Sequence, residues 1–196
     1  MNQLMALYGF NREIKNRRFE TVTNAANTES TLYIYDMIVS DALTAEWMGG
    51  VDAQTFVNAL SAITAPTIHI RINSPGGDVF AARAIEQSIK THPSNIIAHI
   101  DGVAASAATY IALAADEILA NEGALFMIHN AWTSTAGDSR DLMSTANLLS
   151  KIDGTLAQTY STKSGKPIDE ITPLMDAETW FTAQEAVDFG FVDSIE

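Results

Sequence analysis

The segment TIHIRINSPGGDV, residues 67–79, gives the clearest indication of the fold in this 196-residue chain. Its first six residues alternate β-branched and polar side chains and predict a strand over 67–72, which ends at the turn NSPGG. Asp78 can then cap a helix that runs to about Thr91. A strand that passes through a tight turn into a helix is the repeating unit of α/β folds with a parallel sheet.

The alternation of strands and helices continues on both sides of this stretch. Further strands are expected at 31–39, 96–100 and 124–128, and further helices at 53–62, 105–115 and 141–163. Near the end, Thr182 and Glu185 have the spacing of a capping box, and Gly190 can end the short helix that they begin. The polar, aperiodic residues 21–31 predict a loop or a mobile connection. The pattern as a whole predicts one α/β domain with a mainly parallel sheet.

The composition excludes several classes of function. There are 11 basic and 24 acidic residues, which give a net charge of −13, and a nucleic-acid binder needs basic surface. The absence of cysteine excludes disulfides, thiolate metal sites and cysteine nucleophiles. No apolar run approaches the roughly 20 residues that a bilayer span requires, and no signal peptide is evident. We therefore expect a cytoplasmic protein that binds neither nucleic acid nor membrane.

Two turns at the ends of predicted strands are candidate sites. Ser106 lies among small residues in GVAASAA, where a strand passes into a helix, and a nucleophile can be held on such a turn. The alternative is a helix of small residues packed tightly on the sheet, with Ser106 as filler. Gly76 and Gly77 allow backbone N–H groups to approach an anion or a carbonyl oxygen, although a tight turn alone would also require glycine.

Of the four histidines, His129 is the candidate general base. It ends the predicted strand 124–128 and opens a polar turn. Because ligand crevices form at the carboxyl ends of parallel strands, we expect His129 and Ser106 to lie at the same edge. An imidazole there can take the proton that a serine hydroxyl does not release unaided. Structural or solvated roles are expected for the other three histidines, His69, His92 and His99.

Four segments together resemble the proteolytic subunit of the Clp protease, and most closely the phage and prophage ClpP-like peptidases that include head maturation proteases. They are INSPGGDV (72–79), GVAASAA (102–108), MIHN (127–130) and TAQEAVDFGFVDSI (182–195). The resemblance implies a single ClpP/crotonase-like α/β domain over 31–196, with repeated β-β-α/βαβ units and a long handle helix at about 138–165. Residues 1–30 would form an N-terminal segment, which we expect to be mobile.

The resemblance also implies a catalytic triad. Ser106 would be the nucleophile, His129 the general base and Glu178 the acidic member that orients the imidazole. The main Clp peptidases have aspartate where this chain has Glu178, and the ETW pattern resembles the phage type. Asp176, two residues earlier, is the alternative for this role.

Further roles follow from the same resemblance. The backbone N–H groups of Gly77 and Ala107 would form the oxyanion hole. An extended peptide would pair with a strand edge near 130–136 by β-augmentation. The residues expected to bind substrate are Gly76, Asn130, Ala131 and Trp132.

The implied function is a serine endopeptidase that works without a metal or an organic cofactor inside an oligomeric chamber. We expect stacked homo-oligomeric rings, heptameric as in the family, with an AAA+ unfoldase or a phage capsid protein as partner. One alternative is a crotonase-like acyl-CoA hydratase or isomerase, which would leave Ser106 and His129 with no reason to be paired and fits the negative charge poorly. The other is a non-catalytic ring subunit, in which the serine or the histidine would have been lost.

Overall fold

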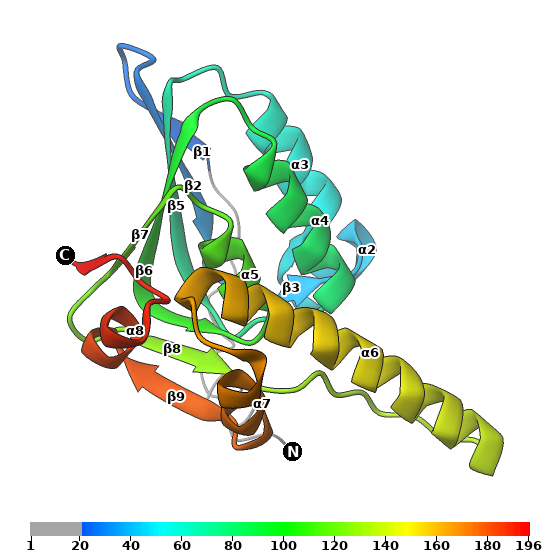
Figure 1. Ribbon diagram of the computed structural model, residues 1–196. Coiled ribbons are helices and arrows are strands. Elements are labelled where there is room, and N and C mark those ends of the chain that lie inside the picture. Colours follow the sequence, from blue (N-terminus) through cyan, green and yellow to red (C-terminus); the bar gives the residue numbers. More distant parts are fainter. Residues whose placement is uncertain (1–20) are drawn as a thin grey trace.

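The computed structural model describes residues 21–196, and its centre is an eight-stranded sheet (Figure 1). The strand order is β1-β2-β5-β6-β7-β10, and β8 pairs with both β6 and β9. Only the β1–β2 and β8–β9 pairs are antiparallel. The strands of this sheet are β1 (Thr21–Thr23), β2 (Glu29–Ile34), β5 (Thr67–Ser74), β6 (Asn95–Ala105), β7 (Glu117–Ala120), β8 (Leu125–Ile128), β9 (Thr179–Thr182) and β10 (Ser194–Ile195).

Three helices, α3, α4 and α5, lie together against one face of this sheet (Figure 1). The alternation in β5 explains the arrangement, because Ile68, Ile70 and Ile72 are fully buried while His69 and Arg71 are turned to the other face. The helices are α2 (Ala42–Met48), α3 (Ala53–Ser61), α4 (Val79–Lys90), α5 (Ala107–Leu113), α6 (Ser139–Ser164), α7 (Ile168–Asp176) and α8 (Ala183–Phe189).

The longest of these helices, α6, projects beyond the sheet (Figure 1). Its C-terminal half packs on the body through Leu156, Ala157 and Tyr160, which are buried. Its N-terminal half is exposed, including the apolar side chains of Leu142 and Met143. No helix between residues 21 and 196 combines the length and the apolar character that a bilayer crossing needs.

The predicted α/β fold with a mainly parallel sheet is confirmed, and several predicted boundaries agree closely with the structure. Asp78 caps α4, since its side chain accepts a hydrogen bond from the Ala81 N–H at 2.7 Å. The capping box at Thr182 and Glu185 is present. The handle helix expected at about 138–165 is observed as α6, with Asp138 and Gly165 as its capping residues.

The predicted strand at 31–39 is wrong as a single element. β2 ends at Ile34, and the chain leaves the large sheet to form β3 (Ile38–Val39), which pairs with β4 (Val51–Asp52). The cause is tertiary: the Ile38 N–H donates to the Gly76 carbonyl and the Ile38 carbonyl accepts from the Asp78 N–H, both at 2.9 Å. These hydrogen bonds hold the segment against the turn after β5.

The predicted loop at 21–31 is also wrong, because β1 and the start of β2 form an antiparallel pair there. Asn24 makes the turn between them, its side chain accepting from the Thr28 N–H at 2.9 Å. The domain boundary that we placed between residues 30 and 31 falls inside β2. The expectations for residues 1–20 lie outside the described residues.

The strand expected at 96–100 continues to Ala105, so the following helix begins at Ala107 and not at 105. The extension has a partner of its own. The first part of β6 pairs with β7, whereas residues 103–105 pair with β8. Pairing with β8 therefore extends β6 up to Ala105, the residue before Ser106.

Candidate active site

Ser106 occupies the turn between β6 and α5 in a strained backbone conformation, with φ 56° and ψ −126°. A residue with a side chain adopts such angles at a cost of about 1–3 kcal/mol, and the surrounding structure must hold it there. The Ser106 N–H donates to the Met127 carbonyl at 2.9 Å, and the Ser106 carbonyl accepts from the Thr109 N–H at 3.0 Å and hydroxyl at 2.6 Å. The serine is thus fixed on a sharp strand-to-helix turn.

The structure brings Ser106 and His129 together, as the sequence predicts. Their side chains are in hydrogen-bonding contact, with 2.7 Å between Ser106 Oγ and His129 Nε2. The parallel register explains this contact, because Ala105 is paired with Met127, so both chains leave the sheet at the same edge. A hydroxyl and an imidazole at this distance can exchange a proton.

Glu178 lies on the other side of the imidazole, with 3.6 Å between its Oε2 and His129 Nδ1. It precedes β9, in which Thr179 is paired with Ile128, so the antiparallel register sets Glu178 opposite His129. Glu178 also has positive φ, 50°, which marks a constrained position. The alternative carboxylate, Asp176, binds elsewhere: its Oδ1 accepts from the Asn130 side-chain amide at 2.7 Å.

The environment of His129 keeps its imidazole neutral. Burial lowers the pKa of His129, whose side chain is almost entirely covered, and this effect outweighs the raising effects of Glu178 and Asp153. A neutral imidazole at pH 7 is free to accept a proton from the hydroxyl of Ser106. The nearby carboxylates would then stabilise the imidazolium.

The Gly76–Gly77 turn lies directly against the Ser106 turn. A Cβ atom at Gly76 would be 2.5 Å from the Ala105 carbonyl oxygen and 2.7 Å from the Ala107 nitrogen. A Cβ atom at Gly77 would be 1.9 Å from the carbonyl oxygen of Ile38. Both positions therefore exclude side chains, and this close approach accounts for the glycine pair.

Two amide groups at these turns are available to a ligand. Ala107 is the first residue of α5, where a helical N–H has no intrahelical acceptor. Within residues 21–196, neither this N–H nor that of Gly77 donates to a protein acceptor. Both are the amides that the resemblance implies for an oxyanion hole.

The chain after His129 is irregular up to Asp138, where α6 is capped. The Ala131 N–H donates to Asp153 Oδ1 at 2.7 Å, and Trp132 is 58% exposed. Residues 130–136 belong to none of the described strands, so the expected pairing of a peptide along them stays a prediction. Sequence reasoning missed Asp153, because its position on a long helix carries no sign of this contact.

The remaining histidines have partners that the sequence did not suggest. His69 Nδ1 and His99 Nε2 are 2.9 Å apart, and His99 Nδ1 lies 3.0 Å from the Glu196 carboxylate. They lie on the sheet face turned away from α3, α4 and α5, beside an ion pair of Arg71 with Asp101. His92 Nδ1 accepts from the Ser94 N–H at 3.2 Å, after the end of α4.

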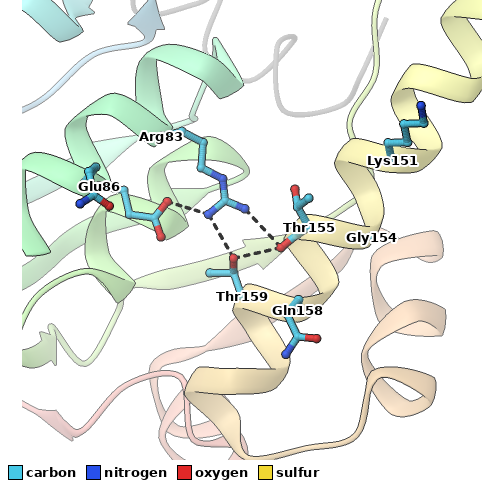
Figure 2. Close-up of a pocket in the computed structure, with 8 residues that line it drawn as sticks. Arg83, Glu86, Lys151, Gly154, Thr155, Gln158 and Thr159 are labelled. Carbon is cyan, nitrogen blue, oxygen red and sulfur yellow. Dashed lines mark hydrogen bonds and ion pairs between the residues drawn. The ribbon is translucent and has the colours of Figure 1, made fainter.

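A separate open groove lies between α4 and α6 (Figure 2). Arg83 crosses it, donating to Glu86 at 2.6 Å and to the hydroxyl of Thr159 at 3.1 Å. None of the predicted site residues lines this groove. Among residues 21–196, no cluster of three or more His, Asp or Glu side chains is placed to hold a metal ion.

The chain is similar to known proteins over most of its length. Residues 15–196 match the Clp protease family. An ATP-dependent Clp protease proteolytic subunit 1 of Leifsonia xyli is 33% identical over 130 residues, which cover 65% of this chain and 66% of that protein. An ATP-dependent Clp protease proteolytic subunit of Streptococcus salivarius is 32% identical over 134 residues, which cover 65% of this chain and 67% of that protein. The matched stretch thus spans about two thirds of the length of these relatives.

The fold has a solved counterpart. The structure of a ClpP1 mutant from Listeria monocytogenes superimposes with a TM-score of 0.72 at 24% sequence identity, covering 87% of this chain and 92% of that one. At this identity the likeness concerns the fold. The predicted ClpP-like architecture is therefore confirmed.

Proposed function

Because this chain belongs to the Clp protease family, whose proteolytic subunits are serine-type peptidases, we propose that it is an endopeptidase with Ser106 as nucleophile, His129 as base and Glu178 as the acidic member. The observation that carries the proposal is the 2.7 Å contact between Ser106 Oγ and His129 Nε2. The strained backbone of Ser106 supports the same role, because strain of this kind gathers at functional sites.

The proposed reaction begins when Ser106 Oγ attacks the carbonyl carbon of a peptide bond. His129 Nε2 takes the hydroxyl proton as the new C–O bond forms, and the carbonyl oxygen becomes an oxyanion. His129 then gives this proton to the leaving amine as the C–N bond breaks, which leaves an acyl ester on Ser106. A water molecule then gives a proton to His129 and attacks the ester carbon. The C–O bond to Ser106 breaks, His129 returns the proton to Ser106 Oγ, and the second product leaves as a carboxylic acid.

Two features of the site would lower the barrier. The free N–H groups of Gly77 and Ala107 would receive the oxyanion, and a donor of this kind contributes about 3 kcal/mol to the transition state. Glu178 would hold the imidazole through Nδ1 and stabilise its charged form. The proposed reaction requires neither a metal ion nor an organic cofactor.

The assembly that we propose is a homo-oligomer of stacked rings, heptameric as expected from the family resemblance, that encloses the active sites. The projecting half of α6 supports it, because Leu142, Met143 and Leu148 are exposed there and a second copy of the chain would cover them. The proposed setting is the cytoplasm. The proposed partners are an AAA+ unfoldase that delivers peptide chains or, for a phage-type enzyme, a capsid protein as substrate.

The crotonase-like alternative receives no support from the site. A hydratase or isomerase would use the glycine turn for a thioester carbonyl but would have no need for a serine against the imidazole. A non-catalytic ring subunit would not require the strained backbone at Ser106. The endopeptidase accounts for both features.

A fluorophosphonate probe tests the proposal directly, because it phosphonylates an activated serine and leaves ordinary serines unmodified. The assembled wild-type protein is expected to be labelled at Ser106, and Ser106→Ala is expected to show no labelling. Ser61→Ala, which changes an exposed serine at the end of α3, serves as the matched control and should be labelled like the wild type. An unlabelled wild-type assembly would contradict the assignment of the nucleophile.

A further inference from the structure

The two residues that follow His129 are each held by a carboxylate from a different helix. Asp153, on α6, accepts the backbone N–H of Ala131 at 2.7 Å. Asp176, the last residue of α7, accepts the side-chain amide of Asn130 at 2.7 Å. Neither carboxylate makes an ion pair with a lysine or arginine of the described residues.

The contact to Ala131 matters because His129 lies at the point where the sheet ends. Up to Ile128 the backbone is fixed by pairing of β8 with its neighbours. Beyond His129 no strand pairing holds the chain, and the next regular element is α6. The Asp153 contact is therefore the first backbone anchor on the far side of the imidazole.

Asp153 also acts on the imidazole through its charge. Burial raises the pKa of Asp153, the Ala131 N–H lowers it, Asp176 raises it and His129 lowers it. In return, Asp153 raises the pKa of His129, together with Glu178. The charged groups that act on the imidazole are thus Glu178, from the turn before β9, and Asp153, from α6, while Asp176, from α7, acts on Asp153.

We propose that Asp153 is a positioning residue for His129. Its carboxylate fixes the backbone that carries the imidazole, and its negative charge stabilises the imidazolium that forms during the reaction. Asp153 does not touch the substrate or the reacting atoms in this proposal. The inference rests on the proposed serine-peptidase function. It adds Asp153, from the long helix α6, to the three triad residues as a fourth residue that affects the reaction.

Two substitutions separate the hydrogen bond from the charge. Asp153→Ala removes both, and kcat is expected to fall by about 10- to 100-fold, since a displacement of about 1 Å of a catalytic group can cost about 100-fold. Asp153→Asn keeps an oxygen that can accept from Ala131 N–H, so kcat at the pH optimum is expected to recover to within about 5-fold of the wild type. KM should change little in both variants, because the substrate is not contacted.

The pH profile gives a measurement that a merely structural role would not change. Loss of the negative charge in Asp153→Asn lowers the pKa of His129, so the acidic limb of kcat/KM is expected to move to lower pH. Titration of 13C-labelled histidine by NMR should show the same displacement for His129 and none for His92. Asp169→Asn, which removes an exposed charge at the beginning of α7, is the matched control and should leave rate and pH profile unchanged.

The outcomes distinguish this inference from the proposed function. If the wild type is labelled by fluorophosphonate and cleaves peptides while Asp153→Ala keeps the wild-type kcat, the positioning role is wrong and the function stands. An NMR titration in which Asp153→Asn leaves the pKa of His129 unchanged would overturn the proposed role of the Asp153 charge. This test remains decisive even if Asp153→Ala does not fold. A wild type that is neither labelled nor active would instead contradict the proposed function.

Discussion

Two histidine–carboxylate pairs occupy different parts of this molecule, one at the end of β8 and the other on the sheet face turned away from α3, α4 and α5. The His99–Glu196 contact, at 3.0 Å, is shorter than the His129–Glu178 contact, at 3.6 Å. The difference lies at the opposite ring nitrogen. His129 Nε2 meets the hydroxyl of Ser106, whereas His99 Nε2 meets a second imidazole, that of His69.

A carboxylate beside an imidazole therefore does not by itself identify a catalytic base. What distinguishes His129 is a serine with strained backbone on one side and two turns with free amide groups beside that serine. The His99 pair has none of these and belongs to a polar network with Arg71 and Asp101. We therefore expect the two pairs to respond very differently to substitution.

The largest effect is expected from exchanging each histidine for glutamine. His129→Gln removes the general base, and kcat/KM should fall by about 1,000-fold or more, as loss of a triad member does. His99→Gln should keep activity within about 3-fold of the wild type, because no reacting atom lies near it. Hydrolysis of a fluorogenic peptide measures both. Equal losses in the two variants would break the distinction between the pairs.

The acidic members give the next comparison. Glu178→Gln is expected to lower kcat by about 100-fold, because the amide neither stabilises the imidazolium nor selects its tautomer. Asp176→Asn should cost less than about 5-fold, since its partner is the Asn130 side chain and not the imidazole. Glu196→Gln, at the second pair, should leave kcat unchanged. A larger loss in Asp176→Asn than in Glu178→Gln would assign the role to Asp176.

The pH dependence should separate the pairs as well. Because burial lowers the pKa of His129, the acidic limb of kcat/KM is expected below about pH 6.5, the ordinary histidine value. The unfolded chain takes up a proton near pH 6.5 that folded His129 does not, so His129 makes folding less favourable as pH falls through this value. Stopped assays between pH 5 and 8 measure the limb, and His99→Gln should leave it in place. A midpoint well above 6.5 would contradict the burial argument.

The smallest effect is expected at the network beside the second pair. Asp101 accepts hydrogen bonds from Arg71 and from the hydroxyl of Tyr35, and its side chain is largely buried. Asp101→Asn should lower the free energy of unfolding by about 1–2 kcal/mol through loss of the charged partner. Peptidase activity of the folded fraction should not change. Thermal unfolding and peptidase activity, measured on the same variant, test this prediction. A loss of activity without a loss of stability would show that this network affects catalysis.

Much of the fold could be predicted from periodicity and turn chemistry alone. The helix after Asp78, the long helix from 139 to 164 and the capping box at Thr182 are local features, and local interactions fix them. The break after Ile34 was not predictable in this way, because it depends on backbone bonds of Ile38 with Gly76 and Asp78, far away in the chain. The hairpin before it has a local turn at Asn24, but its second strand also pairs with the distant β5.

Residue identities already define which chemistry is available here: a serine among small residues, a histidine at a strand end, a glycine pair, and no cysteine. Which of these groups come into contact depends on the folded chain. Strand register set His129 against Ser106 and Glu178, turned Asp176 to Asn130, and brought Asp153 from a distant helix to the Ala131 N–H. The physical reason is that hydrogen bonds and charges act over a few ångströms of space, and only the pairing of strands and packing of helices converts positions along a chain into such distances.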